Sequence, residues 1–200
     1  MTTGTGDAEF DQYTALVVVD VQNDFADPAG GLYVEGGEQV VPVVNELVNA
    51  ACDAGALVLY TQDWHPASTP HFEKDGGVWP VHCVAGTWGA DLHPDLDVDG
   101  HVIRKGTGGE DGYSGFAARD VTTGQETSTG LQEMLDERDI SDIVVVGLAQ
   151  DVCVKETVLD AQRLGYATSV VVSATRPVDR VRGDGERALE ALRQAGVELR

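Results

Sequence analysis

The chain alternates between short apolar runs and longer segments in which apolar residues recur at helical spacing. The runs are rich in β-branched residues and apolar at consecutive positions, which is typical of strands buried on both faces of a parallel sheet. The predicted strands cover residues 15–19, 56–60, 101–104, 143–146, 167–172 and 197–199.

Between these runs, apolar residues recur every three to four positions and predict amphipathic helices. The predicted helices cover residues 40–54, 130–138, 152–164 and 186–194. Gly55, Gly165 and Gly196 follow three of them, as expected where a helix ends. The alternation of strands and helices predicts an α/β fold with a parallel sheet and helices on both of its faces.

Two glycine-rich stretches, residues 64–100 and 106–130, contain none of the predicted helices or strands. Segments of this length without regular structure are uncommon inside a compact domain, and they are usually functional or disordered. We therefore look for chemistry in these stretches and at the strand ends that lead into them.

The length of 200 residues fits one domain, which we expect to cover residues 14–200 after a polar tail over residues 1–13. Asp and Glu number 34 against 13 Lys and Arg, so the net charge is −21. That charge argues against nucleic acid and anionic membranes as partners. The sequence shows no signal peptide and no apolar run of membrane-spanning length, so we expect a cytoplasmic protein.

The acidic residues are spread along the chain and predict a solvated surface whose self-repulsion is screened by salt. We therefore hypothesise that the protein works in a salt-rich cytosol, as in a halophile. Its thermal unfolding midpoint should rise between dilute buffer and molar KCl. A midpoint that does not respond to KCl would rule the hypothesis out.

Reactive side chains follow three predicted strands. Asp20 follows the first strand, Lys105 the third, and Cys153 lies just after the fourth, where a helix is predicted to begin. Ligands of open parallel sheets bind at the carboxyl ends of the strands. A helix N-terminus favours a thiolate, and an acid and a lysine beside it would complete a nucleophilic triad. The alternative is that these charges are solvated strand ends and that the cysteine belongs to the core.

A second group of reactive residues follows the second predicted strand and consists of Asp63, His65, His71 and His82. Three of the five histidines of the chain lie in this segment. Imidazole and carboxylate ligands suit zinc, iron or manganese, and a site with three or four protein ligands and open positions is typical of a catalytic metal. The alternative is a set of polar loop histidines that bind no metal.

Several common motifs are missing. No Gly-x-Gly-x-x-Gly follows the first strand, residues 106–109 lack the lysine of a phosphate loop, and no Gly-x-Ser-x-Gly elbow occurs. The other two cysteines are interpreted as structural. Cys52 is expected to be a small core residue within a helix, and Cys83, beside His82, a buried thiol rather than a fifth metal ligand.

Six motifs occur in the order of a known family. The sequence resembles the nicotinamidase/pyrazinamidase branch of the isochorismatase-like cysteine hydrolases from about residue 15 to 172. The resemblance implies a three-layer α/β/α sandwich around a six-stranded, mainly parallel sheet, and deamidation of nicotinamide in NAD salvage. The motifs are Asp20-Val-Gln-Asn-Asp-Phe25, Gln62-Asp-Trp-His-Pro66, Trp79-Pro-Val-His-Cys-Val84, Arg104-Lys-Gly-Thr107, Tyr113-Ser114 with Phe116, and Gly147-Leu-Ala-Gln-Asp-Val-Cys-Val-Lys155.

The resemblance also implies a role for each matching residue, and it places a cis peptide at Leu148–Ala149. Gln150 stands where the family more usually has threonine. The implied roles are Asp20, Lys105 and Cys153 as the catalytic triad; the N–H groups of Ala149 and Cys153 as the oxyanion hole; Phe25, Trp79 and Tyr113 as the wall of a pyridine pocket; and Asp63, His65, His71 and His82 as ligands of one divalent metal, with zinc favoured.

Other functions stay open from the sequence. Within the superfamily they are an amidohydrolase for N-carbamoyl or ureido substrates and an isochorismatase, which lack this metal set as the family is known. A non-enzymatic metal-binding protein or thiol sensor is a further alternative, although a sensor needs a resolving cysteine near the reactive one. The expected partner is a small amide substrate. The sequence does not decide the metal, the preference between nicotinamide and pyrazinamide, or whether the chain forms a homo-oligomer.

Overall fold

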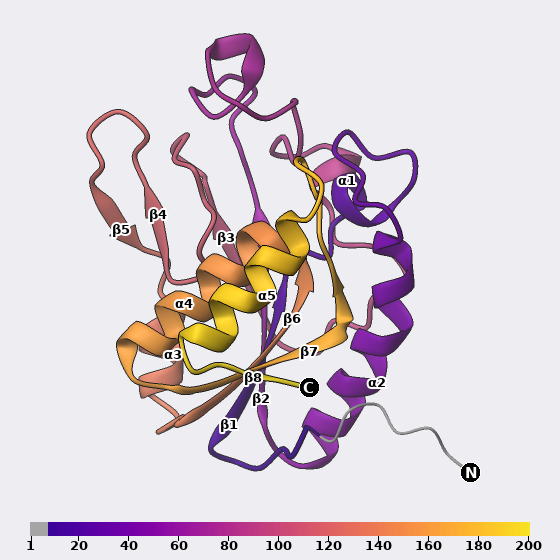
Figure 1. The fold of residues 1–200 in the computed structure, drawn as a ribbon, viewed down its shortest axis with the longest axis vertical. Coiled ribbons are helices and arrows are strands. Elements are labelled where there is room, and N and C mark those ends of the chain that lie inside the picture. Colours follow the sequence, from indigo (N-terminus) through magenta and orange to yellow (C-terminus); the bar gives the residue numbers. More distant parts are fainter. Residues whose placement is uncertain (1–7) are drawn as a thin grey trace.

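A six-stranded sheet forms the centre of the computed structural model, which describes residues 8–200 (Figure 1). All neighbouring strands are parallel, in the order β3-β2-β1-β6-β7-β8. Each predicted strand is present, and β7 continues beyond the predicted end at residue 172. The strands are β1 (Thr14–Val19), β2 (Leu57–Asp63), β3 (His101–Lys105), β6 (Asp142–Leu148), β7 (Ala167–Arg176) and β8 (Glu198–Leu199).

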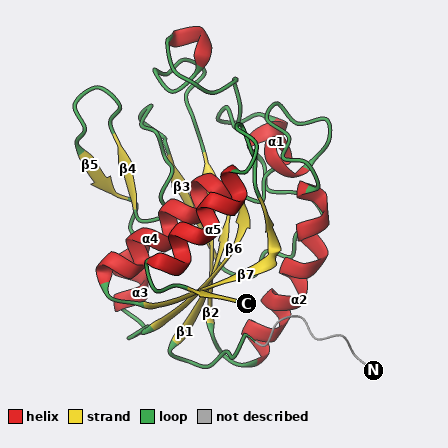
Figure 2. Ribbon diagram, viewed as in Figure 1, coloured by secondary structure: helices red, strands yellow, loops and turns green. Residues whose placement is uncertain are grey.

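The helices cover both faces of the sheet and confirm the predicted three-layer sandwich (Figure 2). One face packs against α2, and the other packs against α3, α4 and α5. A four-residue helix, α1, follows β1 and was not predicted. The helices are α1 (Asn23–Ala26), α2 (Val40–Asp53), α3 (Leu131–Asp136), α4 (Lys155–Leu164) and α5 (Asp184–Gln194).

The central strand β1 shows why the strands are apolar at consecutive positions. Leu16 and Val18 point into the core under α2, whereas Ala15, Val17 and Val19 point into the core under α3 to α5. All five side chains are buried. Burial of apolar surface on both faces of each central strand is the main stabilising contribution in such a sheet.

One pair of strands lies within residues 106–130, where no regular structure was predicted. β4 (Ala117–Arg119) and β5 (Glu126–Ser128) form an antiparallel hairpin beside the main sheet (Figure 1). All three residues of β5 are exposed. Local alternation of apolar and polar residues, the usual signal of a strand, is therefore absent here.

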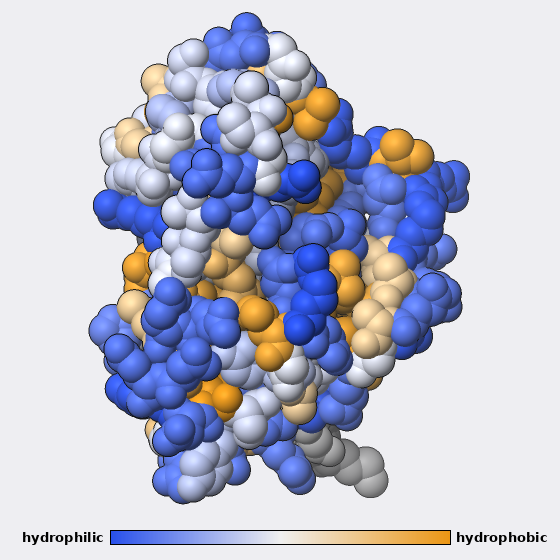
Figure 3. Space-filling model, turned by 90° about the vertical axis from the view of Figure 1, so that its left-hand side faces the viewer, coloured by the Kyte–Doolittle hydropathy of each residue, from blue (hydrophilic) through white to orange (hydrophobic). Residues whose placement is uncertain are grey.

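The N-terminal segment and the surface of the molecule complete the description of the fold. Residues 1–7 of the predicted polar tail lie outside the described residues, while Ala8 and Phe10 pack partly against the core. Within residues 8–200, no helix is both long and apolar enough to cross a membrane. Hydrophilic residues dominate the face shown in Figure 3, with smaller apolar patches between them.

Gly147 of β6 pairs with Val19 of β1. Its φ is +109°, and a Cβ atom built on it would lie 2.1 Å from the carbonyl oxygen of Val19. Gly147→Ala should therefore lower the free energy of unfolding by about 3 kcal/mol or more, because backbone strain and overpacking add. Urea unfolding of the variant measures this loss.

Gly55 offers the matched control for that substitution. Its φ is also positive, at +75°, but no atom lies within 4 Å of a Cβ built there. Gly55→Ala should cost only about 1–2 kcal/mol, the strain of a left-handed residue alone. Equal losses in the two variants would contradict the close approach of β6 and β1.

Candidate active site

The reactive residues predicted from the sequence come together at the carboxyl edge of the sheet. Asp20 directly follows β1, and Asp63 and Lys105 are the last residues of β2 and β3, where the parallel register pairs them. Cys153 lies after β6 on a π-helical turn, Gln150–Val154, that leads into α4. The strand order therefore carries side chains from four distant segments to one place.

Lys105 joins the reactive residues into one buried cluster. Its Nζ lies 2.7 Å from Asp20 Oδ2, 2.5 Å from Asp63 Oδ1 and 3.8 Å from Cys153 Sγ, and it also donates to the carbonyl oxygen of Gly112. Burial lowers the pKa of Lys105, but the two carboxylates outweigh it and hold that pKa well above its usual value. The ammonium is therefore a fixed cation between the carboxylates and the thiol.

The carboxylate beside the thiol has a pKa that suits a general base. Burial raises the pKa of Asp20 to about 6, against the opposing charge of Lys105. A carboxylate with a pKa near the working pH is an effective general base. The acceptor atoms of Asp20, Asp63 and Cys153 all lie within 4.8 Å of one another. Asp20 is thus positioned to take the thiol proton.

Burial opposes the ionisation of the Cys153 thiol, which the helix N-terminus and Lys105 favour. Burial raises the pKa of its thiol well above the usual value, and Lys105 lowers it only in part. The helix N-terminus and the lysine charge are visible in the sequence, whereas the complete burial of the sulfur is not. The thiol therefore keeps its proton until a base removes it.

The predicted metal ligands form a second buried cluster beside the first. Ring nitrogens of His65, His71 and His82 lie within 4.8 Å of one another, and Asp63 Oδ2 is 3.8 Å from His65 Nε2. Neither ring nitrogen of His65 has a hydrogen-bond partner among the described residues. Because buried polar atoms nearly always have partners, this arrangement fits a metal ion.

The protonation of the histidines supports the same interpretation. Burial lowers the pKa of His71 to about 3 and also lowers the pKa of His82. Both imidazoles are therefore neutral at physiological pH, which is the form that binds metals. Three imidazoles and one carboxylate suit zinc, iron or manganese.

Polar side chains after β1 hold the long loop that carries the histidines. Asp24 accepts the N–H of Cys83 at 2.6 Å, next to His82. Gln22 donates to the carbonyl oxygens of Asp63 and Ala90, each at 2.8 Å. Sequence reasoning did not assign these positioning roles, although polar residues directly after a buried strand were an available signal.

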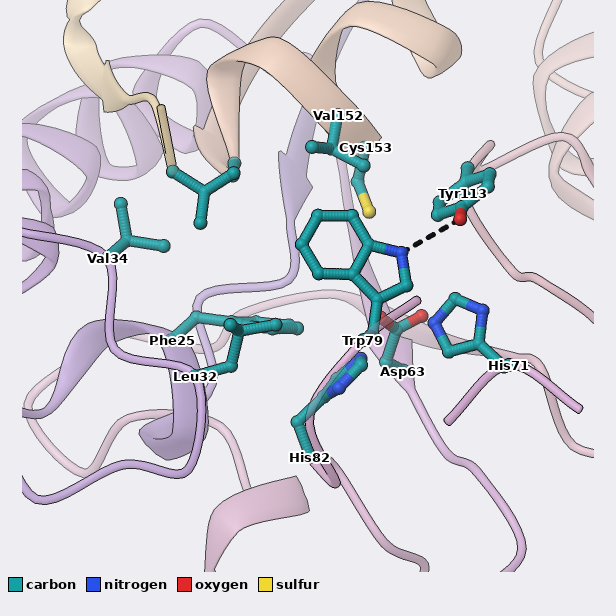
Figure 4. A pocket seen from close by; sticks show the side chains of 12 residues that line it. Phe25, Leu32, Val34, Asp63, His71, Trp79, His82, Tyr113, Val152 and Cys153 are labelled. Carbon is teal, nitrogen blue, oxygen red and sulfur yellow. Dashed lines mark hydrogen bonds between the residues drawn. The ribbon is translucent and has the colours of Figure 1, made fainter. Parts of the chain in front are cut away.

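One cavity lies against both clusters (Figure 4). Phe25, Trp79 and Tyr113 line it as predicted, and Trp79 Nε1 donates to Tyr113 Oη at 2.9 Å. Sequence reasoning missed the aliphatic part of the wall, which comes from segments without a motif of their own. The full lining is Phe25, Leu32, Val34, Asp63, His71, Trp79, His82, Tyr113, Ala149, Val152, Cys153 and Val178.

Three further expectations concern the peptide bond before the nucleophile turn and the burial of Cys83 and Cys52. The peptide bond between Leu148 and Ala149 is cis, as the resemblance implies. Cys83 is buried, as predicted. The prediction that Cys52 belongs to the core is wrong, because it lies on the exposed side of α2, with its sulfur 3.8 Å from a carboxylate oxygen of Asp99.

The fold and the geometry of the site can be compared with known proteins. The family model of the isochorismatase domain matches residues 14–200. The chain belongs to the isochorismatase family. Among relatives of this family, the nicotinamidase of Escherichia coli is 36% identical over 92% of this chain and 93% of its own length. The nicotinamidase/pyrazinamidase of Mycobacterium tuberculosis is 40% identical over 92% and 97%.

Solved structures of isochorismatase-family enzymes have the same architecture. PnC1 from L. infantum in complex with nicotinate superposes with a TM-score of 0.87 at 32% identity, covering 96% of this chain and 95% of that one. The pyrazinamidase of Pyrococcus horikoshii in complex with zinc gives 0.82 at 33% identity, covering 94% and 98%. The resemblance inferred from the six motifs is confirmed.

Proposed function

We propose that this protein is a nicotinamidase, which hydrolyses nicotinamide to nicotinate and ammonia and also accepts pyrazinamide. The observation that carries the proposal is a single cavity bordered by two clusters, one containing a thiol, a carboxylate and a lysine, the other three imidazoles and a carboxylate. The names of the relatives and the nicotinate in the L. infantum enzyme support this substrate.

The cavity suits a small aromatic amide. Phe25, Trp79 and Tyr113 provide flat apolar surface for the ring, while the reactive groups lie on its inner side. Asp63 and the three clustered histidines would hold one divalent ion, for which zinc is favoured because the P. horikoshii relative binds it. When bound, such an ion supplies a Lewis-acidic partner for the pyridine nitrogen.

The first half of the proposed reaction transfers the acyl group to the enzyme. Asp20 takes the proton of Cys153, and the sulfur attacks the carboxamide carbon. The N–H groups of Ala149 and Cys153 stabilise the negative oxygen. The C–N bond then breaks as Asp20 returns the proton to the leaving nitrogen, which yields ammonia and a thioester.

The second half releases the acid. Asp20 accepts a proton from a water molecule, whose oxygen attacks the thioester carbon. The C–S bond breaks, the carboxylic acid leaves, and the sulfur of Cys153 recovers its proton. Throughout, Lys105 stays charged between the carboxylates and holds Asp20 in place, which is a positioning role.

The rival amidohydrolases of the superfamily are also among the relatives. A ureidoacrylate amidohydrolase of Methylobacterium radiotolerans is 29% identical to this chain. Its named substrate has no aromatic ring, whereas this cavity has an aromatic wall and a buried imidazole cluster beside it. These observations favour the pyridine amide.

A direct assay tests the proposal. The metal-loaded protein should convert nicotinamide to nicotinate and ammonia in equal amounts, followed by chromatography and an ammonia assay. Ureidoacrylate and isochorismate serve as comparison substrates. A higher kcat/KM for either of them than for nicotinamide would show that the proposal is wrong.

A further inference from the structure

A second groove adjoins the active-site cavity at Trp79. Trp79, Val152 and Val178 line both spaces. The wall of the groove contains three basic residues, Lys155, Arg180 and Arg187, and two acidic residues, Asp151 and Asp184. In a chain with 13 basic residues and a net charge of −21, an excess of basic over acidic residues beside the cavity is unexpected.

Arg180 differs from the other two basic residues in having no carboxylate partner among residues 8–200. Arg187 pairs with Asp184 at 2.5 Å, and Lys155 pairs with Glu156 at 3.1 Å. No ion pair or hydrogen bond involves the Arg180 guanidinium within the part of the chain that the structure describes. Its charge and its five N–H donors are therefore available to a ligand.

The position of this guanidinium is set by stacking. Its Cζ lies 4.6 Å from the centre of the Trp79 ring, a cation–π geometry. The segment that carries Arg180 is tied to the turn of the nucleophile, since the buried carboxylate of Asp151 accepts the N–H groups of Val178 and Asp179 at 2.8 and 2.9 Å. The cation is thus held at the edge of the cavity.

We propose that Arg180 receives the carboxylate of the acid product at the mouth of the cavity. This inference rests on the proposed function, in which a neutral amide becomes an aromatic carboxylate. The net charge of −21 makes the protein as a whole repel anions. An unpaired guanidinium at the exit matches the geometry and charge of a carboxylate, but it gains little from the neutral amide.

The test compares the affinities of the acid and the amide in metal-loaded Cys153→Ala protein, which cannot turn the amide over. Arg180→Gln should weaken the binding of nicotinate about fivefold more than that of nicotinamide, the upper range for an exposed ion pair. Arg180→Lys should restore most of the nicotinate affinity. The difference should shrink in molar salt, which screens the charge. Titration calorimetry measures each dissociation constant.

Arg193→Gln is the matched control, because Arg193 is an exposed arginine of α5 outside both spaces, 3.6 Å from Glu190. An equal effect of the two glutamine variants, or no effect of Arg180→Gln, would overturn the proposal. Equal weakening of nicotinate and nicotinamide would also overturn it, since Arg180 would then act only by packing against Trp79.

An ammonia assay of the wild-type protein distinguishes failure of the proposed nicotinamidase function from failure of the proposed role of Arg180. If the wild type does not hydrolyse nicotinamide, the proposed function fails, and the role of Arg180 fails with it. If the wild type hydrolyses nicotinamide and Arg180→Gln binds nicotinate as tightly as its parent, only the role of Arg180 fails.

Discussion

Cys153→Ala should lower kcat for nicotinamide by at least about 10⁴-fold, because removal of a nucleophile abolishes the covalent route. The variant should still bind metal and nicotinamide, since the imidazole cluster and the aromatic wall remain in place. Ammonia release measures the loss of turnover, and calorimetry measures the retained binding of nicotinamide.

Cys52→Ala is the control for that variant. It also removes one thiol, but from an exposed position on α2 that does not line the cavity. Its kcat should match that of the wild type. Appreciable ammonia release by Cys153→Ala would contradict the assignment of the nucleophile.

His65→Ala should lower the affinity for the divalent metal by at least about 100-fold, since loss of even an outer partner of a ligand costs 10–100-fold. His65 is fully buried, and both of its ring nitrogens lack a partner among the described residues. Elemental analysis after gel filtration measures the bound metal. Added metal should raise the thermal midpoint of the wild type, but not that of the variant.

His101→Ala is the matched control for the metal prediction. His101 is exposed on β3 and lies outside the imidazole cluster. Its variant should bind as much metal as the wild type. Full metal content in folded His65→Ala protein would show that His65 is not a ligand.

The convergence of Asp20, Asp63 and Lys105 could be predicted from the sequence, because each follows or ends a buried strand. Parallel strands in one sheet have their carboxyl ends at the same edge, so local patterns were enough to bring these residues together. The strands themselves were predictable for a related reason, since burial on both faces leaves an unbroken apolar run.

The role of the histidines in the long loop could not be predicted from local sequence patterns. Spacing alone left His71 and His82 open between metal ligands and polar loop residues, and only the resemblance to a family named them as ligands. The path of this loop depends on distant contacts, such as the bond from the Cys83 N–H to Asp24. Such contacts leave no periodic signal.

Burial decides two properties of the cysteines that the sequence does not reveal. The thiol pKa of Cys153 depends on how completely the surrounding segments enclose it, which neither the helix N-terminus nor the neighbouring lysine reveals. Conversely, Cys52 lies next to buried Ala51 on α2 but on the exposed side of the helix. In both cases the type of residue was a poor guide to its environment.

The central claim is that this cavity is the site of a metal-dependent amidase, and ammonia release from nicotinamide before and after chelation tests it most directly. We predict that the purified protein holds about one divalent ion per chain and releases ammonia, that chelation removes both the ion and the activity, and that zinc, iron or manganese restores them. Unchanged ammonia release from fully metal-depleted protein, or none from metal-loaded protein, would contradict the claim.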